Sequence, residues 1–287
     1  MAIVAQHFDS NLGRWTHVGW TPAPGHPLEW AVDRVWDFDG MAAHPQERVF
    51  PNGHLELIVQ LDDRYLDVTA GGTVPTPAAC VTGIFSRSAV VQAPPRPCRV
   101  LGVRLRPEGA WALLAHPLCQ LAELTADLGD LLGAAGGELA ERCHDASSGI
   151  ERVRRAVAWL GVRLGRAGAR RVDPAVHWVA RRIADSGGSR PIAALRAETG
   201  LTDARLIALF REQVGVTPKR LARIHRFDRA LGLLSREDGS LASVAHRAGY
   251  FDQPHMNAEF REMAGLTPRE FLAATRYPNS LSLPEPA

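Results

Sequence analysis

FREQVGVTP, at residues 210–218, returns 50 positions later as FREMAGLTP, at residues 260–268, and six of the nine positions are identical. Upstream of each copy, residues 192–200 match residues 241–249 at an offset of 49. The difference of one residue between the two offsets falls in a turn, where a change of length is tolerated. Such a repeat is difficult to produce by chance, so the sequence predicts two copies of one supersecondary unit.

Each copy carries the signals of a helix, a tight turn and a second helix. Gly200 and Gly249 each follow a short helical pattern and supply the left-handed backbone that ends it. Thr202 and Asp252 then stand where the second helix needs an N-cap. The Thr-Pro pair at the end of each copy would start a further helix, and the first of these, to about residue 235, would connect the copies. The pattern therefore predicts two helix-turn-helix units, whose second helices can enter the major groove of DNA.

The residues upstream of the repeat have a different pattern. Leu and Val alternate with other residues over 55–61 and 100–106, and clusters of Pro and Gly separate such stretches. Period-two alternation with regular turn signals predicts an antiparallel sandwich or a cupin-like barrel. An apolar stripe over 150–164 predicts one longer helix, which would either pack on its own domain or pair with a second copy of the chain.

The predicted fold is therefore α+β and multidomain, with four segments. They are a β-rich sensor or oligomerisation domain (1–115), a helical linker region (116–171), an all-α tandem helix-turn-helix domain (172–277) and a flexible tail (278–287). A chain of 287 residues is long enough for two domains, and its 46% hydrophobic and 22% charged residues are typical of a globular protein.

Composition and charge narrow the function classes. No apolar run reaches the roughly 18–20 residues of a membrane span, and the first ten residues do not read as a secretory signal, so we expect a cytoplasmic protein without membrane contact. The first 170 residues have 16 Arg against 18 acidic residues, whereas the remainder has 17 Arg and Lys against 13 acidic residues. An excess of basic charge in the second part favours a polyanionic partner.

The 172–277 segment resembles the tandem helix-turn-helix domain of the AraC/XylS family of bacterial transcription regulators. The residues that carry this resemblance are 192–200, 210–218, 245–250, 252–253 and 260–271. Upstream, residues 51–59 and 102–110 resemble the sensor half of an AraC-like subgroup. The resemblance implies a DNA-binding regulator with double-stranded DNA as its partner. A small-molecule effector and RNA polymerase are further partners that such a regulator can have.

The resemblance implies that the helix from residue 203 to about 213 and the helix that follows Asp252 read the bases. The base-reading candidates are Arg205, Arg211, Gln253, His255, Asn257 and Arg261. Gln and Asn suit adenine, and Arg suits guanine. Basic residues after the two Thr-Pro pairs suit phosphates, and these candidates are Lys219, Arg220, Arg223 and Arg269.

The first unit departs from the family pattern. Many members carry large polar residues where this sequence has Ala204, Ile207 and Ala208. Small and apolar side chains can touch a thymine methyl but make no bidentate base contact. Arg205 and Arg211 are therefore the best polar candidates for base contacts in the first unit.

The sequence also leaves three other functions open. A cupin-type metalloenzyme needs converging ligands, but the upstream His residues are scattered without an H-x-H pair, and we expect no metal or other cofactor. An alkyl-acceptor repair protein needs an activated cysteine, for which Cys98 between Arg96 and Arg99 is the candidate. An architectural DNA binder with an inert N-terminal domain would show weak sequence preference. We expect a regulator that is not an enzyme.

The sensor domain offers aromatic residues as a candidate ligand pocket. Trp15, Trp36 and Trp111 are the candidates, although Trp residues also serve as ordinary core residues of a β domain. The expected mechanism is that a signal at the first domain changes how the second is presented to a promoter. A monomer with two units can span two successive major-groove segments, and a homodimer would add affinity by linking two such readers.

Overall fold

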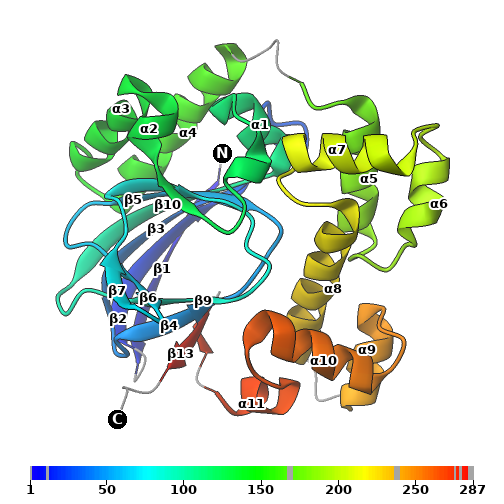
Figure 1. Ribbon diagram of the computed structural model, residues 1–287. Coiled ribbons are helices and arrows are strands. Elements are labelled where there is room, and N and C mark those ends of the chain that lie inside the picture. The colour runs from blue at the N-terminus through cyan, green and yellow to red at the C-terminus, as the bar shows by residue number, and fades with distance from the viewer. Residues whose placement is uncertain are drawn as a thin grey trace.

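The N-terminal part of the protein is two antiparallel sheets with helices on one side, and the C-terminal part is helical (Figure 1). The structure is a computed structural model, and it describes residues 2–10, 13–166, 171–235, 240–274, 276–277 and 280–283. Among the described helices, none is long and apolar enough to cross a membrane.

The first sheet has seven strands. In spatial order they are β1 (Ile3–Ser10), β2 (Gly13–Trp20), β3 (Val32–Ala42), β10 (Cys98–Leu105), β5 (Leu55–Gln60), β8 (Ala79–Thr82) and β11 (Thr125–Asp127). The second sheet has six, in the order β12 (Arg276–Tyr277), β13 (Ser280–Leu283), β4 (Gln46–Val49), β9 (Ala89–Gln92), β6 (Leu66–Thr69) and β7 (Gly72–Pro75). The predicted antiparallel β-rich domain is confirmed, and its two sheets do not close into a barrel.

The predicted alternation along β5 divides the seven-stranded sheet into two faces. Leu55, Leu57 and Val59 are buried in the hydrophobic core, whereas Glu56 and Ile58 line a cavity on the other face. Four helices pack on the core face: α1 (Pro107–Leu114), α2 (Leu128–Leu132), α3 (Ala134–His144) and α4 (Gly149–Arg166). The cavity lies between the two sheets and is therefore closed from both sides by strands.

The predicted linker region is part of the N-terminal domain. β11 extends the first sheet beside β8, and the apolar stripe of α4 is buried against β2 and β3. Arg152 of α4 is buried and donates to Asp37 of β3 from Nε at 2.6 Å. These helices exclude water from the core face of the sheet. The stripe packs on its own domain.

The tandem units contain the predicted elements. The first comprises α5 (Pro174–Asp185), α6 (Ile192–Ala197) and α7 (Asp203–Gln213), and the second comprises α9 (Leu241–Ala248), α10 (Gln253–Ala264) and α11 (Pro268–Ala273). A single helix, α8 (Pro218–Leu234), connects them (Figure 1). Thr202 caps α7, Asp252 caps α10, and Thr217 and Thr267 cap the helices that begin with Pro. The cap positions predicted from the repeat are confirmed.

The end of the chain differs from the predicted flexible tail. Residues 280–283 form β13, and Ser280 is the register partner of Val49 on β4. The tail residues 278–279 and 284–287 lie outside the described residues. The chain thus returns from the helical domain to the second sheet of the N-terminal domain.

Candidate nucleic-acid interface and effector cavity

The reading helix of the first unit is short of polar side chains. Leu206, Leu209 and Phe210 are buried, as predicted for the core face of α7. The opposite face exposes Ala204, Arg205, Ile207, Ala208 and Arg211. The two arginines are its two exposed cationic groups, so hydrogen-bonded base contacts from this face depend on them.

The reading helix of the second unit is more polar. Met256 and Phe260 are buried in the core. His255 and Arg261 are exposed, whereas Gln253 and Asn257 are half-buried. The Asn257 Oδ1 atom is buried and has no hydrogen-bond partner among the described residues. The structure thus brings the four predicted base-reading residues together on α10, with different degrees of exposure.

One predicted phosphate contact is engaged elsewhere. Arg223 of α8 donates to Glu259 from Nε at 2.7 Å and to Glu262 from Nη2 at 2.6 Å, and both carboxylates belong to α10. These partners raise the pKa of Arg223 above its usual range. Arg226 also reaches Glu259, at 3.3 Å, and its guanidinium lies over the Tyr250 ring. The Arg223 guanidinium thus holds α10 on α8, and its contact with a phosphate stays a prediction.

This ion-pair network was not predicted from the sequence. Its signal was the pair Glu259 and Glu262, which the helical period places on one side of α10. Their partners lie more than 30 residues away on another helix, so spacing alone could not identify them.

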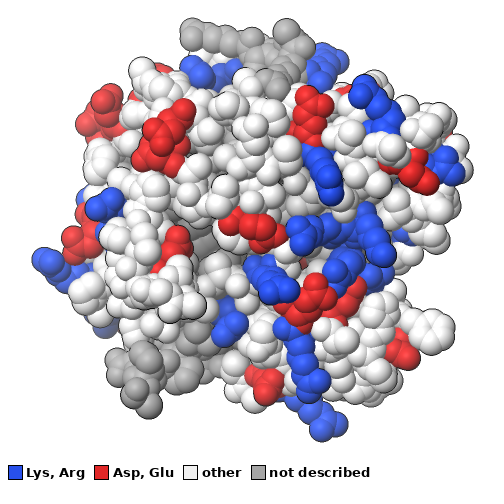
Figure 2. Space-filling model, in the orientation of Figure 1, with Lys and Arg blue, Asp and Glu red and all other residues white. Residues whose placement is uncertain are grey.

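The other phosphate candidates are exposed. Lys219 and Arg220 lie in the first turn of α8, and Arg269 lies in the first turn of α11. Arg220 also forms an ion pair with Glu123 of the N-terminal domain at 3.5 Å. Figure 2 shows Lys and Arg side chains gathered between the two helical units. A groove of about 520 Å³ lies there, lined by residues that include Arg190, Lys219 and His255.

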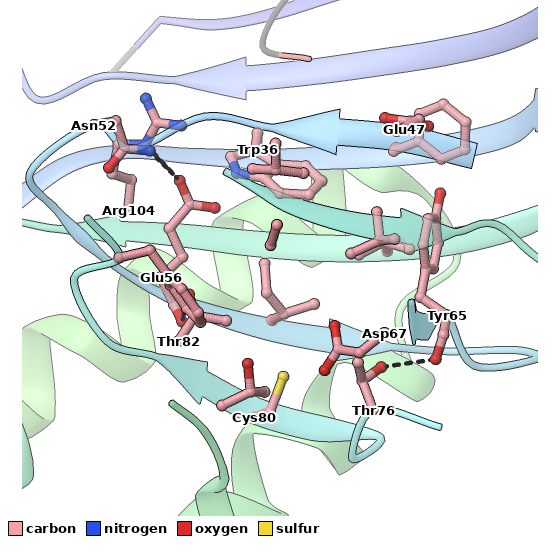
Figure 3. Close-up of a pocket in the computed structure, with 18 of the residues that line it drawn as sticks. Trp36, Glu47, Asn52, Glu56, Tyr65, Asp67, Thr76, Cys80, Thr82 and Arg104 are labelled. Atoms are coloured by element: carbon pink, nitrogen blue, oxygen red, sulfur yellow. Dashed lines mark hydrogen bonds and ion pairs between the residues drawn. The ribbon is translucent and has the colours of Figure 1, made fainter. Parts of the chain in front are cut away.

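The cavity between the sheets has a volume of about 320 Å³, within reach of the usual size of a small-molecule site (Figure 3). Trp15 and Trp36 line it, as expected. Trp111 instead is buried on α1, on the opposite face of the first sheet, so its predicted place in the pocket is corrected. The indole of Trp111 fills the core between sheet and helices.

Polar groups stand at two ends of the cavity. At one end Arg104 Nε donates to Glu56 Oε1 at 2.7 Å, and the Asn52 amide reaches the same oxygen at 3.3 Å (Figure 3). At the other end the Thr76 hydroxyl donates to the Tyr65 carbonyl at 3.0 Å. Sequence reasoning missed these residues, because Glu56 and Arg104 lie on separate strands of the first sheet, the other three lie in loops, and the five share no local pattern.

Residues 49–54 form a wall of the cavity and also contact the helical domain. The Phe50 ring lies 6.1 Å from Phe227 of α8 and 5.9 Å from Phe271 of α11. The His54 ring lies 6.4 Å from His225, whose pKa burial lowers to about 4. Five of the six residues, all but Gly53, line the cavity. Next to this segment, Arg48 Nη1 donates to the Ala264 carbonyl of α10 at 2.9 Å. One segment thus borders both the cavity and the connecting helix.

The structure also places the residues considered for the two enzymatic alternatives. Cys98 is buried, and burial raises the pKa of its thiol to about 11, whereas an activated acceptor needs a lowered pKa. Among the described residues, no group of three or more His, Cys, Asp or Glu side chains is placed to hold a metal ion.

Two family models match the chain. Residues 195–274 match a family described as a helix-turn-helix domain, and residues 21–127 match a domain of unknown function (DUF6597). The second match covers most of the two-sheet domain, and the first covers α7 to α11. No curated protein matches the chain in sequence.

Several solved structures are also similar to this chain or to part of it. ToxT from Vibrio cholerae O395 is 10% identical over 80% of this chain and 96% of that chain, with a TM-score of 0.44. A probable AraC family regulator from Rhodopseudomonas palustris CGA009 is 28% identical over 35% of this chain and 96% of that chain, with a TM-score of 0.31. The C-terminal domain of AraT, a response regulator from Geobacillus stearothermophilus, is 20% identical over 37% of this chain and 88% of that domain, with a TM-score of 0.35. By these two family matches, the chain carries an AraC-type helix-turn-helix domain toward its C-terminus and a DUF6597 domain toward its N-terminus.

Proposed function

We propose that the protein is a sequence-specific DNA-binding transcription regulator of the cytoplasm. The observation that carries this proposal is the pair of helix-turn-helix units on one connecting helix, each with an exposed face on its reading helix. The exposed Lys219, Arg220 and Arg269 near helix N-termini support contacts to phosphates, which position the protein on DNA. Arg205, Arg211, Gln253, His255, Asn257 and Arg261 remain the proposed base readers.

We also propose that a small molecule in the cavity controls DNA binding. The segment 49–54 supports this, because it lines the cavity and packs on α8 and α11. A ligand that moves Phe50 or His54 would change the packing against Phe227 and His225. Since α8 carries both units, such a change would alter the presentation of both reading helices to a promoter.

The first experiment tests sequence-specific binding. The purified full chain is mixed with a pool of random duplexes at physiological salt, and bound duplexes are selected and sequenced. We expect an enriched motif with two elements separated by about one helical turn of DNA. Binding without enrichment would contradict a specific regulator and favour an architectural DNA binder.

The second experiment tests the coupling between domains. The affinity for a selected duplex is compared between the full chain, its Phe50→Ala variant and residues 172–287 alone. We expect the three to differ, because Phe50 joins the cavity wall to α8 and α11. Equal affinity and equal transcription from a reporter promoter, under every inducing condition tried, would contradict the coupling.

A further inference from the structure

The cavity wall carries more acidic than basic groups. Three carboxylates line it, those of Glu47, Glu56 and Asp67, whereas Arg104 is the one Lys or Arg among its described lining residues. Arg104 is already engaged by Glu56 at 2.7 Å, which neutralises that carboxylate. The formal charges of the described lining side chains therefore sum to a negative value.

The histidines of the wall do not offset this charge. His17 and His54 both line the cavity, and burial is the largest cause that lowers the pKa of each below its usual value. Both rings are therefore neutral near pH 7. They can donate or accept a hydrogen bond but bring no cation to the wall.

Glu47 and Asp67 lie in one row across the second sheet. Val91 of β9 is the register partner of Glu47 on β4 and also of Asp67 on β6. The two carboxylates are thus about 10 Å apart, two strand spacings, at their backbones, and they border one part of the cavity (Figure 3). The Asp67 carboxylate has no hydrogen bond or ion pair with any residue that the structure describes, and burial raises its pKa. A positively charged group beside Asp67 would compensate for the water that this carboxylate has lost.

Aromatic rings face this acidic row from the first sheet. Gly102 is the cross-strand partner of Trp36, and a Cβ atom at Gly102 would lie 2.0 Å from Cε2 of the indole. The missing side chain lets the indole lie flat on the strand, so that its other face is turned to the cavity (Figure 3). The rings of Trp15 and Phe38, with centroids 6.1 Å apart, continue this wall. Indole faces attract cations and also pack well on flat apolar groups.

We infer that the cavity binds a hydrophobic organic cation, such as an amine carried by an aromatic or alicyclic ring. Its ammonium group would lie near Asp67, and its ring would pack on Trp36 and Trp15. The inference rests on the proposed function, because it names the chemical class of the effector. A carboxylate ligand would instead be repelled by Asp67, and the Arg104 guanidinium is already paired with Glu56.

The test uses the full chain and matched sets of probes that share a ring and differ in the head group. One set is phenethylamine, phenethyl alcohol and hydrocinnamate, and another is tryptamine, tryptophol and indolepropionate. Binding is measured by calorimetry and by quenching of Trp fluorescence. We expect the amine of at least one set to bind about tenfold or more tightly than its alcohol and its carboxylate. Equal or tighter binding of the alcohol or carboxylate, or no binding by any amine, would overturn the inference.

Two variants and a control test whether the amine probes bind in the cavity. We expect Asp67→Asn to lower the amine affinity about tenfold and leave the alcohol affinity unchanged. Trp36→Leu should weaken the amine as well, and it provides a second test if Asp67→Asn alters folding. Asp63→Asn is the matched control, because Asp63 is exposed and outside the cavity. Equal amine binding by wild type, Asp67→Asn and Trp36→Leu would overturn the assigned site.

These results are independent of DNA binding. The probes bind in the absence of DNA, so a failure of amine binding would overturn the inference and leave the duplex selection unaffected. A failure to enrich any duplex would contradict the proposed regulator, whatever the probes show.

Discussion

The two helix-turn-helix units share one framework and differ on their reading faces. Both have a capped reading helix, a fully buried Phe on it and a following helix that begins Thr-Pro. On α7, small and apolar residues occupy much of the exposed face, whereas α10 carries Gln253, His255, Asn257 and Arg261. The two units therefore share their framework residues but differ in their reading residues. We infer that the second unit reads more of the DNA sequence.

The two units are also held differently. α10 is fixed on α8 by Arg223, Glu259 and Glu262, and its C-terminal end accepts a hydrogen bond from Arg48 of the N-terminal domain. α7 instead packs on the 3₁₀ turn Leu118–Gln120 of the N-terminal domain. The N-terminal domain thus contacts both units, and through different chemistry.

The largest expected effect concerns the shared framework. Phe210→Ala and Phe260→Ala should each destabilise the helical domain by about 3–5 kcal/mol, because both rings are fully buried. Urea unfolding of the full chain checks this, with exposed Ile207→Ala as the control. A large loss at one Phe and a small loss at the other would contradict the equivalence of the two frameworks.

The next effect concerns base reading. Arg205→Ala, Asn257→Ala and Arg261→Ala should each weaken binding to the selected duplex by about 1–3 kcal/mol if the side chain contacts a base, and should relax specificity at one position. Titration with the selected duplex and with single-base variants measures both. Arg142→Ala, on α3 of the N-terminal domain, is the control. An unchanged preferred sequence and affinity for Asn257→Ala would show that Asn257 is not a base reader.

Helix caps should give smaller and similar effects in the two units. Thr202→Ala and Asp252→Ala each remove a side chain that accepts a hydrogen bond from the helix, at 3.3 Å and 2.8 Å. We expect a loss of about 1 kcal/mol for each. Thr202→Ser keeps the acceptor and should retain the stability of wild type in the same unfolding measurement. If it is as destabilised as Thr202→Ala, the cap is not the cause.

Lys219 tests the contacts that do not read sequence. Lys219→Ala should weaken binding to selected and unrelated duplexes alike and lower the slope of log affinity against log salt by about one. Affinities at several salt concentrations give the slope. A loss confined to the selected duplex would mean that Lys219 reads a base.

The smallest expected effect is a pH dependence of stability that belongs to the first unit. His177 of the first unit lies 3.1 Å from Glu108, and this hydrogen bond is the largest cause that raises the pKa of His177, against the opposing effects of burial and of Arg181. The protonated His177 therefore stabilises the folded protein below about pH 6.5, and this stabilisation is lost as the pH rises through the raised pKa of His177. Because the His177 side chain is half-exposed, we expect less than about 1 kcal/mol. His177→Gln should remove this part of the pH dependence of stability, and an unchanged pH profile would contradict it.

Local signals carried most of what could be predicted. The caps Thr202 and Asp252, the Phe residues of the core and the alternation along β5 each depend on a few neighbouring residues. The cavity, the partners of Arg223 and the packing of residues 116–166 on the first sheet join residues far apart in the chain. Sequence spacing contains no direct signal for such contacts, and Trp111 illustrates the limit, because core and pocket tryptophans have the same local pattern.

The central claim is that two units with one framework read DNA unequally. The most direct measurement is the affinity of the full chain for every single-base substitution of the selected duplex. We predict two elements about one helical turn apart, with costs of about 1–3 kcal/mol per base pair in one element and smaller costs in the other. Arg261→Ala should reduce the free-energy cost at one base pair of the element with the larger costs, and leave the costs in the other element unchanged. Equal costs in both elements, or no base pair with a cost, would contradict the claim.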